Sequence, residues 1–173
     1  EDLKDRYAFY TAQSYRDADM PEKAIEWYAK RANLGGWYEE VYYSLLQIAL
    51  LKIELNAPLD EVQNLLLSAY EYRPQRAESL YHLARQLRLH DKIKLAYIYA
   101  TVAANIPLNK DILFVDHSVY EWKAKDELAV SAYWVGNYQL CHNLCVELLF
   151  NPAVPEQNKK RFLDNLMLAK KHL

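Results

Sequence analysis

Apolar residues recur at helical spacing along nearly the whole chain, which predicts α-helices joined by short turns. Pro21, Gly35, Gly36, Pro74 and Pro107 interrupt the pattern where helices are expected to begin or end. We expect nine helices, at residues 3–18, 21–33, 38–55, 58–72, 77–89, 92–105, 118–134, 138–150 and 156–171.

The helices group into pairs whose second members carry a recurring pattern, as in tetratricopeptide repeats. The pattern places a small residue first, a bulky residue four positions later and a small residue seven positions later, as in Val62, Leu66 and Ala69. Arg31 departs from it, because it stands where a small residue is expected. The first positions of the four pairs are separated by 38, 34 and 45 residues, at Ala24, Val62, Ala96 and Cys141.

One helix pair cannot close a core alone, so neighbouring pairs must stack. The sequence therefore predicts an all-α fold, a tetratricopeptide-like α-solenoid of about four degenerate helix pairs plus a C-terminal capping helix. We expect one domain, residues 1–173. The expected pairs are 3–33, 38–72, 77–105 and 118–150, with the cap at 156–171.

Composition excludes several classes of function. The chain has 3 glycines, too few for the phosphate-binding loops of nucleotide-binding proteins, and its net charge of -2 lacks the basic footprint of a nucleic-acid-binding domain. No signal peptide or membrane span is expected, and two cysteines one helical turn apart fit a reducing, cytoplasmic compartment. Because the chain begins without Met, we expect it to be a segment of a longer protein.

Two clusters could carry chemistry, and we expect both to be structural. Cys141 and Cys145 share a helix face, but a structural zinc site needs four ligands and no second cysteine pair exists. We therefore expect both thiols to pack in the core, with no metal and no cofactor. Asp116 and His117 are adjacent in the irregular stretch 108–117, where Asp116 or Ser118 is expected to cap the following helix. We expect the apolar residues 112–115 of that stretch to be buried under neighbouring helices.

Several strings are more specific than a bare repeat pattern, among them YAFYTAQSYRDA, GGWYEEVYY and AYEYRPQRAE. With residues 24–28, 80–84, 113–122 and 126–130, they resemble the helical-repeat region C-terminal to the catalytic domain of family 2 glycosyltransferases. In that family a separate α/β domain with a D-x-D metal motif does the catalytic work. The resemblance thus implies a glycosyltransferase context without catalytic residues in this segment. Asp17 and Asp19 have the D-x-D spacing, but they lie at a helix end with no strand before them.

In repeats of this class, the first helix of each pair faces a concave groove. Counting along those helices predicts a mixed, aromatic and locally basic groove. Its expected members are Arg6, Phe9, Gln13, Arg16, Gln47, Glu78, Tyr81, Arg85, Arg88 and Tyr133. The carboxylate clamp that binds chaperone C-termini needs Asn at two groove positions, whereas this chain has Gln13, Leu51 and Arg85 there. Arg85 and Arg88 could instead recognise an anionic partner. The alternative is that they pair with Glu78, Asp91 and neighbouring residues and only keep the surface soluble.

The sequence favours a non-catalytic helical-repeat scaffold or interaction module, as part of a glycosyltransferase protein. Its partner would be the linked glycosyltransferase domain or another protein, and a homo-oligomer is compatible with this interpretation. The alternative is a stand-alone peptide-binding adaptor that uses the concave groove. An enzyme that works with this chain alone is the third hypothesis.

Overall fold

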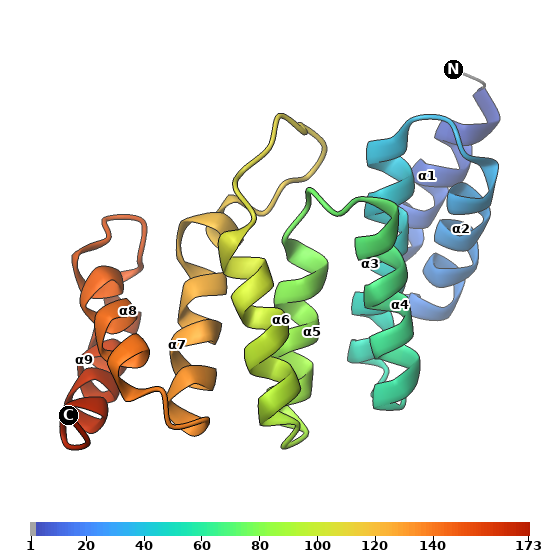
Figure 1. Cartoon of the computed structure of the whole chain (residues 1–173). Helices are drawn as coiled ribbons and strands as arrows, with labels where there is room; N and C mark the ends of the chain where they lie inside the picture. Colours follow the sequence, from blue (N-terminus) through green and yellow to red (C-terminus); the bar gives the residue numbers. More distant parts are fainter. Residues whose placement is uncertain (1–2) are drawn as a thin grey trace. The chain divides into compact units, whose positions relative to one another are not determined.

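The computed structural model describes residues 3–173, and these residues form helices and connecting loops without any strand (Figure 1). The all-α prediction is confirmed. In this part of the chain a π-helical turn, η1 (Val119–Lys123), leads directly into the seventh α-helix. The α-helices are α1 (Leu3–Asp17), α2 (Pro21–Leu34), α3 (Tyr38–Glu54), α4 (Leu59–Tyr72), α5 (Glu78–Leu89), α6 (Ile93–Asn105), α7 (Ala124–Trp134), α8 (Tyr138–Phe150) and α9 (Glu156–Lys170).

The same turn joins the two helices of every pair. One residue adopts a left-handed backbone with φ between 54° and 83°, and it is Asp19, Asn56, Asp91 or Gly136. The next N–H donates to a carbonyl five residues earlier at 2.8–2.9 Å, as in a Schellman motif. Asp, Asn and Gly are the residues that reach this conformation at low cost. Four copies of one turn support the predicted four-pair repeat.

Contacts between helices divide the chain into two compact units. Unit 1 comprises the residues up to Pro74 together with Lys110–Val115, and unit 2 comprises Gln75–Asn109 together with Asp116–Leu173. Unit 1 therefore contains α1 to α4, and unit 2 contains α5 to α9. The organisation as a single domain stays a prediction.

The core of unit 1 lies where α1, α2 and α3 meet, around Phe9, Ala12, Ala24, Tyr28 and Tyr43. Ala12 and Ala24 are fully buried, which lets the two helices of the first pair approach closely. The aromatic rings of Phe9, Tyr28 and Tyr43 pack edge to face at centroid separations of 5.8–6.4 Å.

Arg31, which breaks the repeat pattern, is fully buried in unit 1 and has its own partners. Its Nε donates to Glu40 at 2.6 Å, and its Nη1 donates to the Gly35 carbonyl at 2.5 Å. A buried cation is tolerated only with such compensation. The acidic residue after the Gly35-Gly36 turn is therefore the reason that Arg31 can occupy a position for a small residue.

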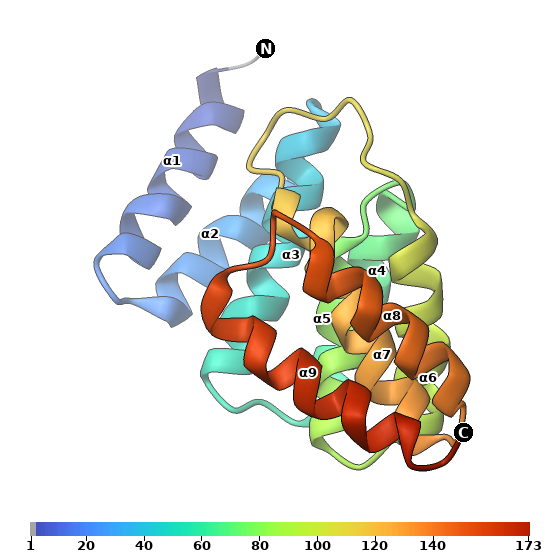
Figure 2. The same cartoon turned by 90° about the vertical axis from the view of Figure 1, so that its left-hand side faces the viewer.

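In unit 2, α8 and α9 lie side by side (Figure 2) and share a core with α7. Phe162 of α9 is fully buried there beside Cys141, Cys145 and Leu148 of α8. The predicted core packing of both thiols is confirmed by this burial. A second cluster joins Ala84, Ala100 and Leu128 of α5, α6 and α7.

The segment 110–115 corrects the prediction for the irregular stretch. Its apolar side chains are not buried as a group, because Ile112 is 80% exposed and Phe114 is 55% exposed. Polar contacts within unit 1 hold it instead: Arg73 donates to Asp111 from two guanidinium nitrogens, and Glu39 accepts the N–H groups of Ile112 and Leu113, both at 2.7 Å. Helical periodicity carries no signal for contacts of this kind.

We expect Ala96→Leu to destabilise the protein by about 1–3 kcal/mol, because an enlarged side chain has no space at a close helix contact. Ala96 is fully buried on α6, which packs against both α5 and α7. Thermal unfolding followed by circular dichroism measures the change. Val102→Leu on the exposed side of α6 is the matched control and should melt like the parent. Equal melting of both variants would contradict the repeat register.

Candidate functional site

A cleft of about 450 Å³ opens in unit 2 between α5, the start of α7 and α9. Helix α5 supplies Tyr81, Arg85 and Arg88, whose spacing of three to four residues puts them on one helix face. The opposite face of α5 is apolar and buried, which fixes the direction of these three side chains. The other lining residues are Trp122, Lys123, Asp126, Glu127, Val130, Arg161 and Asn165.

Two bidentate ion pairs shape the walls of the cleft. Arg88 donates to both oxygens of Glu127 at 2.5 and 3.0 Å, and Arg161 donates to both oxygens of Asp126 at 2.8 and 2.7 Å. Planar guanidinium–carboxylate pairs of this kind are rigid as well as strong. They connect α5 to α7 and α9 to α7, so the backbone around the cleft is held from both sides.

Arg85 differs from these two arginines. Its side chain is exposed and makes no hydrogen bond or ion pair with the residues that the structure describes. Lys123 lies on the same cleft but is paired with Asp116 at 2.9 Å. Arg85 is thus the cation in this cleft that is available to a ligand.

The groups beside Arg85 are neutral at physiological pH. Burial raises the pKa of Tyr81, and Arg85 offsets part of that shift. Burial lowers the pKa of His82 to about 4, and the charge of Arg85 contributes to this lowering. Tyr81 and His82 also pack edge to face at 4.9 Å between ring centroids. A ligand would therefore meet the Arg85 cation beside the uncharged ring of Tyr81.

The structure brings together three of the groove residues predicted in unit 2, Tyr81, Arg85 and Arg88. It places the other two elsewhere. Glu78 is buried and accepts from Arg76 at 2.7–3.0 Å and from the Tyr120 hydroxyl at 2.8 Å. The alternative in which the arginines pair with nearby acidic residues holds for Arg88, but its partner is Glu127 and not Glu78 or Asp91.

Tyr133 lies at the other end of α7 and packs against Tyr138 and His172 at 5.4 and 6.1 Å. It is not among the residues lining the cleft. Sequence reasoning missed Arg161, because the periodicity of α9 carries no signal for a partner on another helix. The signal that could have found it is the acidic residue Asp126, which stands on the groove-facing helix of the preceding pair.

In unit 1 the predicted groove residues have varied surroundings. Phe9 is a core residue, 2% exposed, so it does not present a free surface. Arg16 donates to the Tyr43 hydroxyl at 2.8 Å and to Asp17. Gln13 and Gln47 are partly buried, and Gln13 Nε2 lacks a hydrogen-bond partner among the described residues. Arg6 is exposed.

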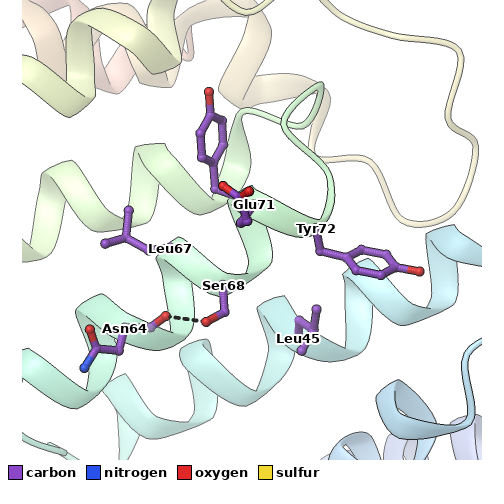
Figure 3. A pocket seen from close by; sticks show the side chains of 7 residues that line it. Leu45, Asn64, Leu67, Ser68, Glu71 and Tyr72 are labelled. Atoms are coloured by element: carbon purple, nitrogen blue, oxygen red, sulfur yellow. Dashed lines mark hydrogen bonds between the residues drawn. The ribbon is translucent and has the colours of Figure 1, made fainter.

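A larger, shallower hollow of about 980 Å³ lies on α3 and α4 of unit 1 (Figure 3). It is lined by Leu45, Asn64, Leu67, Ser68, Tyr70, Glu71 and Tyr72. The Ser68 hydroxyl donates to the Asn64 carbonyl of its own helix at 2.8 Å, and Tyr72 points away from Leu67 and Asn64 in Figure 3. Its polar groups do not converge, so the smaller cleft of unit 2 is the stronger candidate for specific recognition.

Asp116 has the predicted capping role. Its Oδ1 accepts the N–H of Ser118 at 3.1 Å just before η1. Burial raises the pKa of Asp116, but hydrogen bonds from Ser118 and Lys123 outweigh it, so the net shift is downward. Within residues 3–173 no group of three or more His, Cys, Asp or Glu side chains is placed to hold a metal ion. None of the helices described is long and apolar enough to cross a membrane.

No protein-family model and no curated protein matches the sequence. Solved structures do match. One is the crystal structure of nearly identical TPR-like repeats from Podosopora anserina, a candidate kinesin light chain, with a TM-score of 0.62 at 15% identity. The match covers 96% of this chain and 85% of that chain. The fold is a TPR-like helical repeat. A single-residue variant of the same repeat protein matches at a TM-score of 0.64, 15% identity and the same coverage of both chains.

We expect Arg88→Ala to destabilise the protein by about 1–3 kcal/mol, because it leaves the Glu127 carboxylate without its partner. That carboxylate is 6% exposed. Arg85→Ala should change stability by less than about 0.5 kcal/mol, since Arg85 is exposed and unpaired. Urea unfolding of both variants measures the contrast. Equal stabilities of the two variants would contradict the ion pair.

Proposed function

We propose that this chain is a non-catalytic protein-interaction module and that the cleft of unit 2 binds an acidic segment of a partner protein. The observation that carries the proposal is Arg85, an exposed cation without an ion pair among the described residues, in a cleft that also contains two bidentate arginine–carboxylate pairs. The TPR-like fold supports a scaffold role, because such repeats use extended helical surfaces for protein contacts.

The chemistry of the cleft favours a carboxylate over a neutral group. Four of the lining residues are cationic and two are acidic, so the cleft has an excess of positive charge. The guanidinium of Arg85 can take a carboxylate in a bidentate arrangement. Trp122, Val130 and Tyr81 line the same cleft and offer apolar surface to a residue beside that carboxylate.

As a more specific part of this proposal, the module is attached to the catalytic domain of a family 2 glycosyltransferase. This attachment is supported by the motif strings of the sequence alone. In that arrangement, the module docks the catalytic domain, a second subunit or the acceptor. The stand-alone adaptor that binds peptides is the alternative, and reading the complete gene for a D-x-D-bearing α/β domain distinguishes the two.

Selection from a random-peptide display library tests the cleft, followed by calorimetric binding of the selected synthetic peptides. We expect selected peptides to be acidic, and Arg85→Ala to weaken their binding by about tenfold or more, the effect of losing about 1.4 kcal/mol from a charge-assisted pair. Binding should also weaken as salt is added, because exposed charges are screened.

Lys94→Ala is the matched control, since it removes one exposed positive charge from α6 in the same unit but outside the cleft. It should leave binding unchanged. Peptides that bind wild type and Arg85→Ala equally well would contradict the cleft as the binding site.

A further inference from the structure

Residues 111–114, the strap, lie against the helices of unit 1 as a bound peptide would. The Asp111 side chain is 3% exposed and accepts from Arg73 Nε at 3.0 Å and from Arg73 Nη2. Arg73 is itself stacked on the ring of Tyr38 at 4.3 Å, which holds the guanidinium in place. Arg73 therefore recognises one acidic side chain of the strap.

The backbone of the strap is held by a single buried carboxylate. Glu39, 4% exposed at the start of α3, accepts the N–H groups of both Ile112 and Leu113 at 2.7 Å. Bonds to the backbone do not depend on the side chains of the bound segment. Both N–H groups donate to the same oxygen, Oε2, so Glu39 recognises a locally turned backbone with two consecutive N–H groups on one side, whatever its sequence.

An aromatic contact completes the attachment. The ring of Phe114 is stacked on Phe9 at 6.4 Å and lies 4.9 Å from Tyr43, centroid to centroid. Phe9 and Tyr43 are 2% and 8% exposed, on the first helices of the first two pairs. Phe9 was predicted to line the groove, and the ring of the chain's own Phe114 lies against it.

Two features distinguish the strap from a core segment. Phe114 and Ile112 remain largely exposed, so the apolar contacts that are lost if the strap leaves are those of the partly buried Leu113 and of one face of the Phe114 ring. Phe114 also has φ of 46°, a left-handed conformation that is unfavourable for a bulky residue and that the surrounding contacts impose. An attachment made of polar contacts, one partly buried leucine and one half-exposed ring can be exchanged.

We propose that Arg73, Glu39 and the Phe9–Tyr43 pair form a second peptide-binding site, in unit 1, which the strap occupies in the isolated chain. Its ligand class is a protein segment that turns as the strap does and has an acidic residue followed three positions later by an aromatic residue. A partner segment of this kind competes with the strap for the same atoms. The strap thus sets a threshold for binding, because a tethered occupant has a high effective concentration.

The test uses the full chain and a fluorescent synthetic peptide with the sequence of residues 108–117, followed by anisotropy. The double variant Asp111→Ala with Phe114→Ala loosens the strap and leaves every residue of the site in place. We expect it to bind the peptide about tenfold or more tightly than wild type does, because the site no longer has to be vacated first. Adding Arg73→Ala to the double variant should abolish this binding.

Ile112→Ala is the matched control on the strap, since it removes an exposed side chain without any of the three contacts. It should behave like wild type. A control peptide carrying Asp111→Asn and Phe114→Ala should not bind any variant. If the double variant loses its helical circular dichroism, Phe114→Gly replaces it, because glycine tolerates the left-handed backbone and removes only the ring.

The proposal would be overturned if the double variant folds but binds the peptide no more tightly than it binds the control peptide. Equal binding by wild type and the loosened variant would overturn it as well, because the strap would then not occupy the site. The cleft of unit 2 is untouched by these variants, so Arg85→Ala should leave this binding unchanged.

Discussion

The structure depends on the inability of one helix pair to bury its own apolar face. Small residues such as Ala12, Ala24, Ala84 and Ala100 let helices approach closely enough to share a core, and all four are at most 1% exposed. The repeated left-handed turn at the middle of each pair keeps the two helices antiparallel and in register. Sequence divergence between the pairs is tolerated as long as these contacts and turns remain.

Buried charges mark the places where the repeat is irregular. Two buried ion pairs lie at Gly- or Pro-containing turns. Arg31, near the end of α2, pairs with Glu40 at the start of α3, and Arg76, just before α5, pairs with Glu78 at the start of that helix. An unpaired charge at such a site would lower the stability of the fold by several kcal/mol. Each pair therefore holds the adjoining turn in place. In unit 1 the same logic extends to Asp111 and Glu39, which fasten a segment that is far away along the sequence. In both units, charged side chains thus take their partners from another element of the chain.

Periodicity predicted the helices within a few residues because helix formation here follows local patterns and turn residues. It also predicted that Tyr81, Arg85 and Arg88 share one face, since that follows from spacing along one helix. Periodicity gave wrong predictions where contacts between residues far apart in the sequence determine the position of a side chain. Glu78 is removed from the surface by Arg76 and Tyr120, and Arg161 reaches the cleft through Asp126. The burial predicted for residues 112–115 failed for the same reason, because polar contacts to Glu39 and Arg73 hold that segment.

The most direct test of this account is amide hydrogen exchange at Ile112 and Leu113 in the wild-type chain, followed by NMR. Both amides donate to the buried carboxylate of Glu39, although the Ile112 side chain is 80% exposed. The account predicts exchange slower than in an unstructured peptide by about a hundredfold or more, since a docked amide exchanges only when the segment opens. Exchange of both amides at the rate of an unstructured peptide would contradict it, because unit 1 would then lack the segment that its buried charges are arranged to hold.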